Sequence, residues 1–244
     1  MTKQPEHIFP IQFRDVHYIA ALYRSNAKAI HENLEGTGLK PALYFMGSPL
    51  VAVGLIQYKE SDLGAYNEMI IAIPVVPEKT GNKLSNWLDL YRPLKKRKVG
   101  QFIIHIPVTT QRSVDAGRMI WGYPKITLPI THDFNKRKIN SRVMSEDQES
   151  VLLEVTGRSS CRIPIPSMNL MTYSFLEQTM LKTFVDVRAK MKWLPASNLV
   201  ISIHNNEHAI CKDLIALDID DKKPVFTMEA KQFRADFYEG KKIR

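Results

Sequence analysis

Short apolar runs separated by turn residues dominate the chain. Gly, Pro and Asn punctuate nine such runs, at residues 42–58, 66–76, 101–109, 125–132, 138–144, 150–163, 179–187, 198–204 and 224–239. Many short strands joined by short turns are typical of a barrel or of a sheet folded on itself. The pattern therefore predicts a mainly β (α+β) fold, a closed antiparallel β-barrel or folded-over sheet, with a few short helices.

Helical patterns are few. Residues 17–34 carry apolar side chains close to a helical stripe, and residues 84–91 and 113–121 are shorter candidates. Pro129 lies inside the run 125–132. Because proline cannot donate to a strand ladder, it predicts a strand edge, a bulge or an early strand end there.

Composition narrows the class of protein. The 244 residues are 44% hydrophobic and contain no internal repeat or linker, so residues 1–244 are expected to form one domain with one large core. The amino terminus lacks an apolar signal core, and no apolar run is long enough to span a bilayer, which predicts a cytoplasmic protein with no membrane partner. Cys161 and Cys211 permit at most one disulfide, and in a reducing compartment both are expected to be buried thiols.

The net charge invites a nucleic-acid interpretation that the motifs do not support. The formal net charge is +9, and short basic runs lie at residues 95–98 and 136–138. These runs fall in predicted loops, and no zinc-finger or RNA-recognition motif accompanies them, so they are expected to be solvated turn lysines. We therefore predict no nucleic-acid partner.

Lys125 stands where a short helix is predicted to end and a strand to begin. Gly122 can supply the positive φ that a helix end commonly needs, and Pro124 disfavours the α region for the residue before it, so the chain must leave extended. The apolar neighbours of the lysine are Trp121, Tyr123, Pro124 and Ile126. Such a collar disfavours a charged amine, and a neutral amine is a nucleophile.

The energetic demand on a nucleophilic lysine is substantial. At the reference pKa of about 10.4, about one lysine in 2500 is neutral at pH 7. Lowering the pKa of the lysine by about 3 takes on the order of 4 kcal/mol, which burial can supply. The alternative is a lysine stem that merely crosses apolar surface, with its ammonium group in water.

Two segments resemble the acetoacetate decarboxylase family. Residues 117–125, in which Gly-Arg is followed by an aromatic-Pro-Lys, are similar to the family's Schiff-base lysine segment. Tyr66-Asn67-Glu68, running into the apolar strand 69–75, is similar to its Tyr-x-Glu strand. The resemblance spans most of the chain and implies that Lys125 forms an imine with the substrate while Glu68 lies in the same pocket. The residues expected to contact the substrate are Tyr66, Arg118, Trp121 and Tyr123.

The sequence departs from the family at three positions. The family has a second lysine directly after the reactive one, where this chain has Ile126, and a side chain at 126 is expected to point to the opposite face of the strand. Another family glutamate, one strand earlier, falls by gap-free counting near Val53. The family's pocket arginine near the amino terminus has no match in register, and Arg14 is the nearest candidate. Of the two routes to a neutral lysine known for this family, desolvation and a neighbouring cation, only desolvation remains.

The resemblance implies the chemistry. It points to a Schiff-base decarboxylase that converts a β-keto acid such as acetoacetate to a ketone and carbon dioxide, with neither a metal nor an organic cofactor, and to a homo-oligomer. The positive net charge raises the local concentration of such an anionic substrate. Two alternatives stay open: imine chemistry equally supports aldol addition or dehydration of a keto acid, and the barrel could bind small carbonyl compounds without catalysis.

Other motifs indicate structure rather than chemistry. No phosphate loop, dinucleotide fingerprint, nucleophile elbow or CxxC pair occurs. Residues 204–208 hold two imidazoles and a carboxylate, but the Asn-Asn pair between them favours a turn over a metal site. His105, inside an apolar run, is predicted to be a hydrogen-bonded strand histidine.

Overall fold

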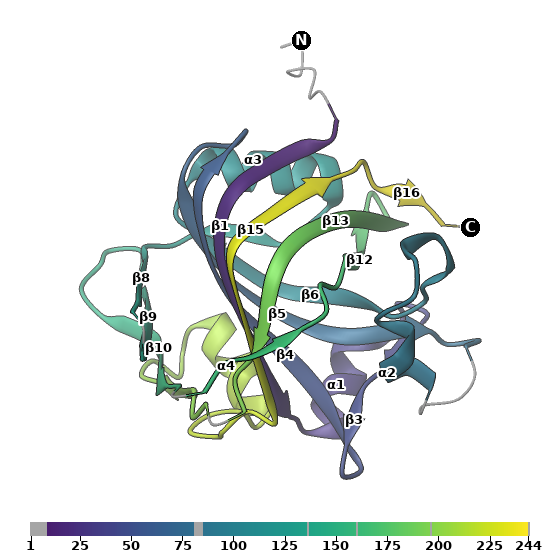
Figure 1. Ribbon diagram of the computed structural model, residues 1–244. Coiled ribbons are helices and arrows are strands. Elements are labelled where there is room, and N and C mark those ends of the chain that lie inside the picture. Colours follow the sequence, from purple (N-terminus) through teal and green to yellow (C-terminus); the bar gives the residue numbers. More distant parts are fainter. Residues whose placement is uncertain (1–8, 81–84, 136, 160, 196, 244) are drawn as a thin grey trace.

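Seven strands close into a barrel in the computed structural model of the protein, which describes residues 9–80, 85–135, 137–159, 161–195 and 197–243 (Figure 1). The barrel strands are β1 (Ile11–Arg24), β4 (Ser48–Ser61), β5 (Tyr66–Pro77), β6 (Gly100–Val108), β12 (Leu170–Leu176), β13 (Thr179–Trp193) and β15 (Phe226–Phe237). Their order is β5-β4-β1-β15-β13-β12-β6, and β6 pairs with β5 to complete the ring. The β6–β12 pair is parallel, and the other neighbours in the ring are antiparallel. The predicted mainly β fold and closed barrel are confirmed.

Shorter elements surround the barrel. The short strands paired with barrel strands are β2 (Leu39–Pro41), β3 (Tyr44–Phe45), β7 (Lys125–Thr127), β11 (Ile163–Ile165) and β16 (Lys241–Lys242). The helices are α1 (Ala27–Leu34), α2 (Ser85–Asp89), α3 (Gln111–Trp121) and α4 (Ala209–Ala216), with a 3-10 turn η1 (Leu94–Lys96). In Figure 1, α3 lies at one end of the barrel, and α1 and α2 lie toward the other. None of the helices in the described ranges is long and apolar enough to cross a membrane.

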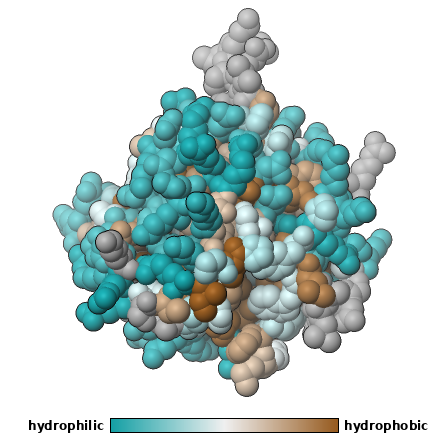
Figure 2. All heavy atoms as spheres, in the orientation of Figure 1, coloured by the Kyte–Doolittle hydropathy of each residue, from teal (hydrophilic) through white to brown (hydrophobic). Residues whose placement is uncertain are grey.

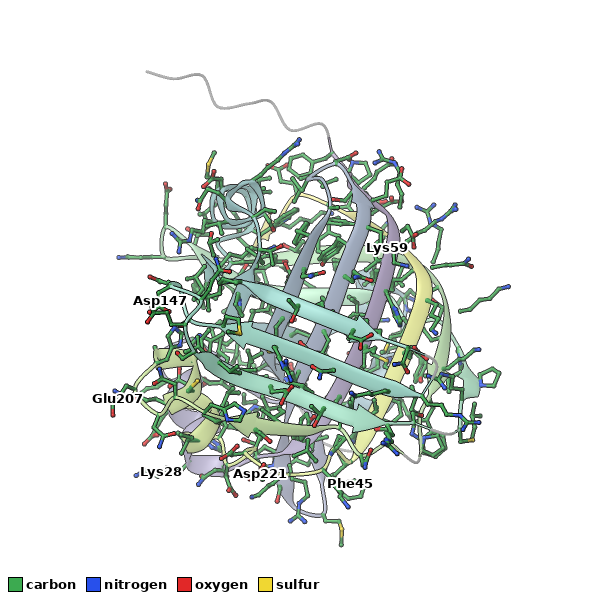
Figure 3. All side chains as sticks on the ribbon, turned by 90° about the vertical axis from the view of Figure 1, so that its left-hand side faces the viewer. Lys28, Phe45, Lys59, Asp147, Glu207 and Asp221 are labelled. Atoms are coloured by element: carbon green, nitrogen blue, oxygen red, sulfur yellow. The ribbon has the colours of Figure 1, made fainter. Side chains whose placement is uncertain are left out.

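A second sheet packs against the outside of the barrel. Its strands run in the order β14 (Val200–Ile203), β10 (Val151–Arg158), β9 (Lys138–Met144) and β8 (Ile130–Phe134). Figure 3 shows these strands in front of the barrel strands and crossing them, with Asp147 in the turn between β9 and β10. One hydrophobic cluster, here called the outer cluster, joins Val53 and Ile71 of the barrel to Val143 and Leu153 of the second sheet. It fixes the second sheet against the barrel wall.

Strand β5 contributes to two hydrophobic clusters at once. Successive side chains of a strand point to opposite faces. Met69, Ile71 and Ile73 belong to the outer cluster, whereas Tyr66 and Ala72 belong to a second, inner cluster inside the barrel. Because both faces are buried, the strand reads as a continuous apolar run.

On the face of the molecule seen in Figure 2, hydrophilic residues predominate and hydrophobic ones gather near the centre.

The predicted helix at residues 17–34 is wrong over its first half. Strand β1 continues through that half, and α1 begins only after Asn26, whose side chain accepts hydrogen bonds from two backbone N–H groups of the first turn. Both faces of β1 are buried there, with Ile19 in the outer cluster and Ala20 in the inner one. Apolar side chains on both faces, together with register shifts in the strand, hide the alternation that would have indicated it.

The predicted runs omit strand β12. A two-residue turn joins it to β13, so that Leu176 pairs with Thr179. The turn residues Glu177 and Gln178 both have positive φ, 48° and 62°. Hairpin turns of this kind usually carry Asn or Gly, so no turn signal was present in the sequence.

Other local predictions hold. Helix α3 confirms the helix at residues 113–121, and α2 confirms the one at 84–91, although residue 84 lies outside the described residues. Strand β7 ends and β8 begins on either side of Leu128 and Pro129, which confirms the early strand end.

The two cysteines are both free thiols. Cys211 is buried, as predicted, in the outer cluster. Cys161 is exposed, so the prediction that both thiols are buried is wrong for this residue. It lies in the connection between β10 and β11 and is not a member of the outer cluster.

Candidate active site

The end of helix α3 sets the direction of the following strand. Gly122 has φ 63°, and its N–H donates to the carbonyl oxygen of Arg118, while the N–H of Tyr123 donates to that of Gly117. These bonds form the left-handed helix end that the sequence predicts. Lys125 then begins strand β7, which runs parallel to β6.

Two residues of α3 hold Lys125 in place. Arg118 Nε donates to the backbone carbonyl oxygen of Lys125 at 2.7 Å. A Cβ added to Gly117 would lie 2.5 Å from Lys125 Cδ, closer than real Cβ contacts come. Glycine therefore leaves the space in which the lysine stem lies, and arginine fixes the backbone, which is a physical reason for the Gly-Arg pair upstream of the lysine.

The Lys125 side chain ends in a buried ion pair. Its Nζ lies 2.6 Å from Glu68 Oε2 and 2.9 Å from Ser113 Oγ. The side chains of Lys125 and Glu68 are only 5% and 3% exposed. The centroid of the Tyr66 ring lies 5.5 Å from Nζ, within range of a cation–π contact. The structure thus brings together the two residues that the sequence indicated as catalytic.

Two stacked tyrosines complete this polar cluster. The ring centroids of Tyr58 and Tyr66 are 4.3 Å apart, and the Tyr58 hydroxyl donates to Glu68 Oε1 at 3.1 Å. Burial, reinforced by the negative charge of Glu68, raises the pKa of both phenols well above their ordinary value of 10.0. Both hydroxyl groups therefore stay protonated at neutral pH and can donate hydrogen bonds.

A cavity of about 280 Å³ lies beside this cluster, inside the barrel. Small residues on four neighbouring strands line it: Ala20 on β1, Ala52 and Gly54 on β4, Ala72 on β5 and Gly100 on β6. In small barrels, side chains of ordinary size at such inward positions fill the interior. Much of the remaining lining is apolar or aromatic, as is usual in small-molecule sites.

Five of the predicted site residues line this cavity: Tyr66, Glu68, Trp121, Tyr123 and Lys125. The indole N–H of Trp121 donates to the carbonyl oxygen of Tyr238 at 2.9 Å. The Tyr123 hydroxyl lies 2.6 Å from Thr172 Oγ1, so it too has a protein partner. The two aromatic residues are therefore held rigidly, with their rings at the cavity wall.

The other two predicted site residues lie outside the cavity lining. Arg14 is half exposed, and its Nη2 lies 2.6 Å from Asp62 Oδ1 at the surface. Arg118 points its Nε at the backbone of Lys125. Neither guanidinium group is among the groups that line the cavity.

The structure also locates two of the three departures from the family, Ile126 and Val53. Ile126 packs against the outer cluster, on the face opposite to Lys125, as the strand alternation predicts. Val53 belongs to the outer cluster as well, so gap-free counting reached a residue on the wrong face of β4. Its neighbours Ala52 and Gly54 line the cavity, and neither carries a carboxylate.

Sequence reasoning missed Arg97. The run at residues 95–98 was expected to be solvated, and its three lysines are exposed, but Arg97 is only 4% exposed and lines the cavity. Its guanidinium donates to the carbonyl oxygens of Asn169 and Arg92. Asn169 lies far along the chain and Arg92 lies outside the run, so nothing in the run itself distinguishes Arg97 from its neighbours.

Tyr58 and Ser113 were also missed, although weak signals exist for both. Tyr58 pairs with Tyr66 across the β4–β5 hairpin, so it follows from the register once the hairpin is assigned. Ser113 stands one helical turn before Gly117 and shares its face of α3. Both positions follow from geometry rather than from a motif.

Histidines outside the cavity have structural roles. His105 Nε2 lies 2.6 Å from Asp213 Oδ2, which confirms the hydrogen-bonded strand histidine. Residues 206 and 207 form a turn, and His208 Nδ1 caps helix α4. Within the described ranges, no three His, Cys, Asp or Glu side chains are grouped so that they could hold a metal ion.

The chain is similar to proteins of one family. The family model described as acetoacetate decarboxylase matches residues 1–192. No curated protein sequence matches the chain.

Solved structures share the fold. The acetoacetate decarboxylase from Legionella pneumophila has a TM-score of 0.73 at 15% identity, with 100% of this chain and 93% of that one covered. An acetoacetate decarboxylase-like enzyme from Sphingomonas wittichii has a TM-score of 0.68 at 12% identity, covering 100% and 97%. The enduracididine biosynthesis enzyme MppR, complexed with the condensation product of pyruvate and imidazole 4-carboxaldehyde, has a TM-score of 0.65 at 12% identity, covering 98% and 92%.

Proposed function

We propose that this chain, which belongs to the acetoacetate decarboxylase family, is a Schiff-base decarboxylase that converts an acetoacetate-like β-keto acid to a ketone and carbon dioxide. The observation that carries the proposal is the buried Lys125 amine, 2.6 Å from Glu68 at the wall of a cavity. An amine in this position has a proton acceptor in contact with it and space beside it for a ketone.

The first half of the reaction forms an imine. A proton passes from the Lys125 ammonium to Glu68 across the 2.6 Å contact and leaves a neutral amine beside a neutral acid. The amine attacks the ketone carbon. Glu68 then returns its proton to the departing oxygen, so that water leaves and a protonated imine remains on Lys125.

The second half breaks the carbon–carbon bond. The electron pair of the bond to the carboxylate moves into the iminium as carbon dioxide leaves, which produces a neutral enamine. A proton from solvent, delivered through Glu68, adds to the enamine carbon, and water hydrolyses the resulting iminium to the ketone and free Lys125. The apolar walls favour this step, because the substrate loses its carboxylate charge there.

The other cavity residues would shape the site rather than react. Tyr58 holds Glu68 through its hydroxyl, and Ser113 holds the amine. Trp121 and Tyr123 present rings whose polar atoms are already engaged, so they define the substrate's position by contact. These assignments give each group near Lys125 one role in binding or positioning.

A second candidate, aldol addition followed by dehydration, has one observation in its favour. The similar fold of MppR holds the condensation product of pyruvate and an aldehyde. In such a condensation a proton, rather than carbon dioxide, leaves the carbon beside the imine and passes to Glu68, and the enamine that results attacks the aldehyde. Added pyruvate and an aldehyde would then yield a condensed product without release of carbon dioxide.

Borohydride trapping tests the proposal. With acetoacetate and the reductant, mass spectrometry should place the adduct on Lys125, and Lys125→Ala should abolish both the adduct and the release of carbon dioxide. Lys59→Ala, at an exposed lysine seen at the surface in Figure 3, is the matched control and should retain both. Labelling spread over surface lysines would overturn the proposal, and a pure binder would show neither adduct nor product.

Two further expectations stay predictions. The homo-oligomer can be measured by light scattering at several protein concentrations. The cytoplasmic location can be measured by fractionation of cells that produce the protein.

A further inference from the structure

The cavity has a second polar end, far from Lys125. Glu68 on β5 pairs with Val108 of β6, and farther along the same two strands Pro74 pairs with Gln101. At about 3.3 Å per residue, the stretch of β5 between these two pairs spans about 20 Å. Glu68 and Gln101 both line the cavity, so the cavity is elongated along the barrel. Trp121 of α3 and Trp87 of α2 both line the cavity, and in Figure 1 these two helices lie toward opposite ends of the barrel.

Arg97 provides a built, charged group at this second end. The residue is 4% exposed and lines the cavity. Its Nη1 donates to the carbonyl oxygen of Asn169, and its Nη2 donates to that of Arg92 at 2.9 Å. Its Nε is buried and has no hydrogen-bond partner among the described residues. The guanidinium is thus fixed in place, and its buried Nε–H is left without a partner among the described residues.

Asp89 holds the segment that carries Arg97. Asp89 Oδ2 accepts from the backbone N–H groups of Lys98 and Val99, each at 2.7 Å. Burial lowers the pKa of Arg97, and the charge of Asp89 opposes that effect. A buried cation of this kind gains most from an anion that reaches it through the cavity.

Gln101 supplies a second unused group. Its Oε1 is buried and, within the described ranges, has no hydrogen-bond partner. A side-chain amide can turn its oxygen or its nitrogen toward a ligand, so Gln101 can also donate there. The far end therefore offers two hydrogen-bonding groups for the oxygens of one anion.

The walls between the two ends are apolar. The lining there includes Ile70, Ile103, Ile106 and Leu170. The cavity is elongated along the barrel and has polar groups at both ends. A substrate longer than acetoacetate, with an apolar middle, fits this shape better.

We propose that the substrate is a β-keto acid with a second, distal carboxylate at the end of an extended apolar chain, which Arg97 binds while Lys125 takes the ketone. This inference rests on the proposed Schiff-base function and names the substrate class of that site. A carboxylate fits because its two oxygens match the free Nε of Arg97 and the amide of Gln101.

Pairs of substrates that differ only at the far end test the inference. The probes are 3-oxooctanedioate with 3-oxooctanoate, and 3-oxododecanedioate with 3-oxododecanoate, and the measurement is kcat/KM for release of carbon dioxide. At least one dicarboxylate should exceed its matched monocarboxylate by about 10- to 100-fold, as a hydrogen bond to a charged group would give. Equal values for both pairs would overturn the inference.

Variants locate the effect. Arg97→Met should bring the ratio of dicarboxylate to monocarboxylate close to one, mainly through KM. Lys95→Met removes an exposed charge from the same run and should keep the ratio. Arg97→Met leaves two carbonyl groups without their hydrogen-bond donors, which costs stability, so Gln101→Leu is the second variant. It should lower the ratio several-fold with the Arg97 contacts intact. A ratio that both variants leave unchanged would overturn the assignment.

The two proposals fail in different ways. If borohydride places acetoacetate on Lys125 but neither dicarboxylate is preferred, only the distal carboxylate site is refuted. If no keto acid forms an adduct on Lys125, the Schiff-base function is refuted, and the substrate class falls with it.

Discussion

Among the described residues, two ion pairs are buried, one on each side of the barrel wall, and their surroundings differ. Inside, Lys125 and Glu68 border the cavity. Outside, His17 Nε2 lies 2.9 Å from Glu229 Oε1, and Arg162 Nε lies 2.6 Å from Glu229 Oε2. His17 and Glu229 are almost fully buried, and the imidazole packs edge-on against Phe134 of the second sheet.

The contrast separates a pair built for stability from one suited to chemistry. Burial alone would raise the pKa of Glu229, but hydrogen bonds from His17 and Arg162, with the charges of Arg162 and Lys231, lower it to about 2. That carboxylate has all its partners in the protein. Glu68 and Lys125 instead border the cavity, where a substrate can displace the Lys125 ammonium from the Glu68 carboxylate. The cavity, rather than burial, is what distinguishes the Lys125–Glu68 pair from the Glu229 cluster.

The largest expected effect is on turnover at the inner pair. Glu68→Gln keeps the size of the side chain and removes the group that accepts the lysine proton. We expect decarboxylation to fall by about 10²- to 10⁴-fold, the usual contribution of a positioned acid–base group. Adduct formation measured over hours should persist, because Lys125 remains. Full turnover in Glu68→Gln, measured as carbon dioxide release, would contradict the assigned role.

The outer pair should instead govern stability. Glu229→Gln leaves the Arg162 guanidinium and His17 without their carboxylate, and breaking a buried pair costs about 3–5 kcal/mol of unfolding free energy. Urea unfolding at pH 7 measures the loss. Glu35→Gln, at an exposed glutamate, is the control and should change little. Turnover per folded molecule should be retained in Glu229→Gln, so a variant of normal stability but no activity would reverse the comparison.

Because of Glu229, we also expect the unfolding free energy to fall at acid pH. The folded-state pKa of Glu229 is about 2, below its ordinary value of 4.5. Its stabilisation is therefore complete above pH 4.5 and is lost as the pH falls toward 2, by about 3 kcal/mol. This loss should be absent from Glu229→Gln, in which the unfolding free energy should vary less over that window.

The sequence predicted the parts of the site that depend on local chain geometry. Gly122 and Pro124 set the direction in which the chain leaves α3, because each restricts the backbone locally. The local sequence is therefore enough to predict where Lys125 lies. Glu68 was found only through the family resemblance, since strand patterning gives a buried glutamate no signature. Arg97 was assigned to solvent, because its burial depends on Asn169, which lies in a distant segment.

The fold shows the same division. Strands with turn residues at their ends were found, whereas the first half of residues 17–34 was assigned to a helix because both faces of β1 are buried. Strand β12 was missed because Glu177 and Gln178 adopt positive φ without the residues that usually do so. The cavity depends on the register between strands that are distant in the sequence. No single apolar run determines that register.

His132 lies between the inner and the outer ion pair, and we expect it to give the next largest effect, on stability at acid pH. Its Nε2 donates to the backbone carbonyl oxygen of Glu68 at 3.2 Å, and its Nδ1 accepts from Ser141 Oγ at 2.9 Å. Burial lowers its pKa from 6.5 to about 4. The neutral imidazole therefore stabilises the fold fully above pH 6.5, and about 3 kcal/mol is lost as the pH falls to about 4.

His132→Gln tests this coupling. The variant should flatten the change of unfolding free energy between pH 6.5 and 4, and His31→Gln, at an exposed histidine, should not. An unchanged slope in His132→Gln would assign the acid sensitivity to other groups.

The smallest effect on the fold, and the sharpest test of the inner pair, comes from Gly117. Alanine there would place a Cβ 2.5 Å from Lys125 Cδ, and the flexible lysine stem can move more easily than the helix. Alanine favours a helix interior over glycine by up to about 1 kcal/mol, which offsets part of the cost of displacing the buried lysine, so the loss of stability should be smaller than in Glu229→Gln. Displacing Nζ from Glu68 and Ser113 should lower kcat by about tenfold, or about 1.4 kcal/mol. Normal kcat in a stable Gly117→Ala variant would show that the ion-pair geometry of Lys125 is not what sets the rate.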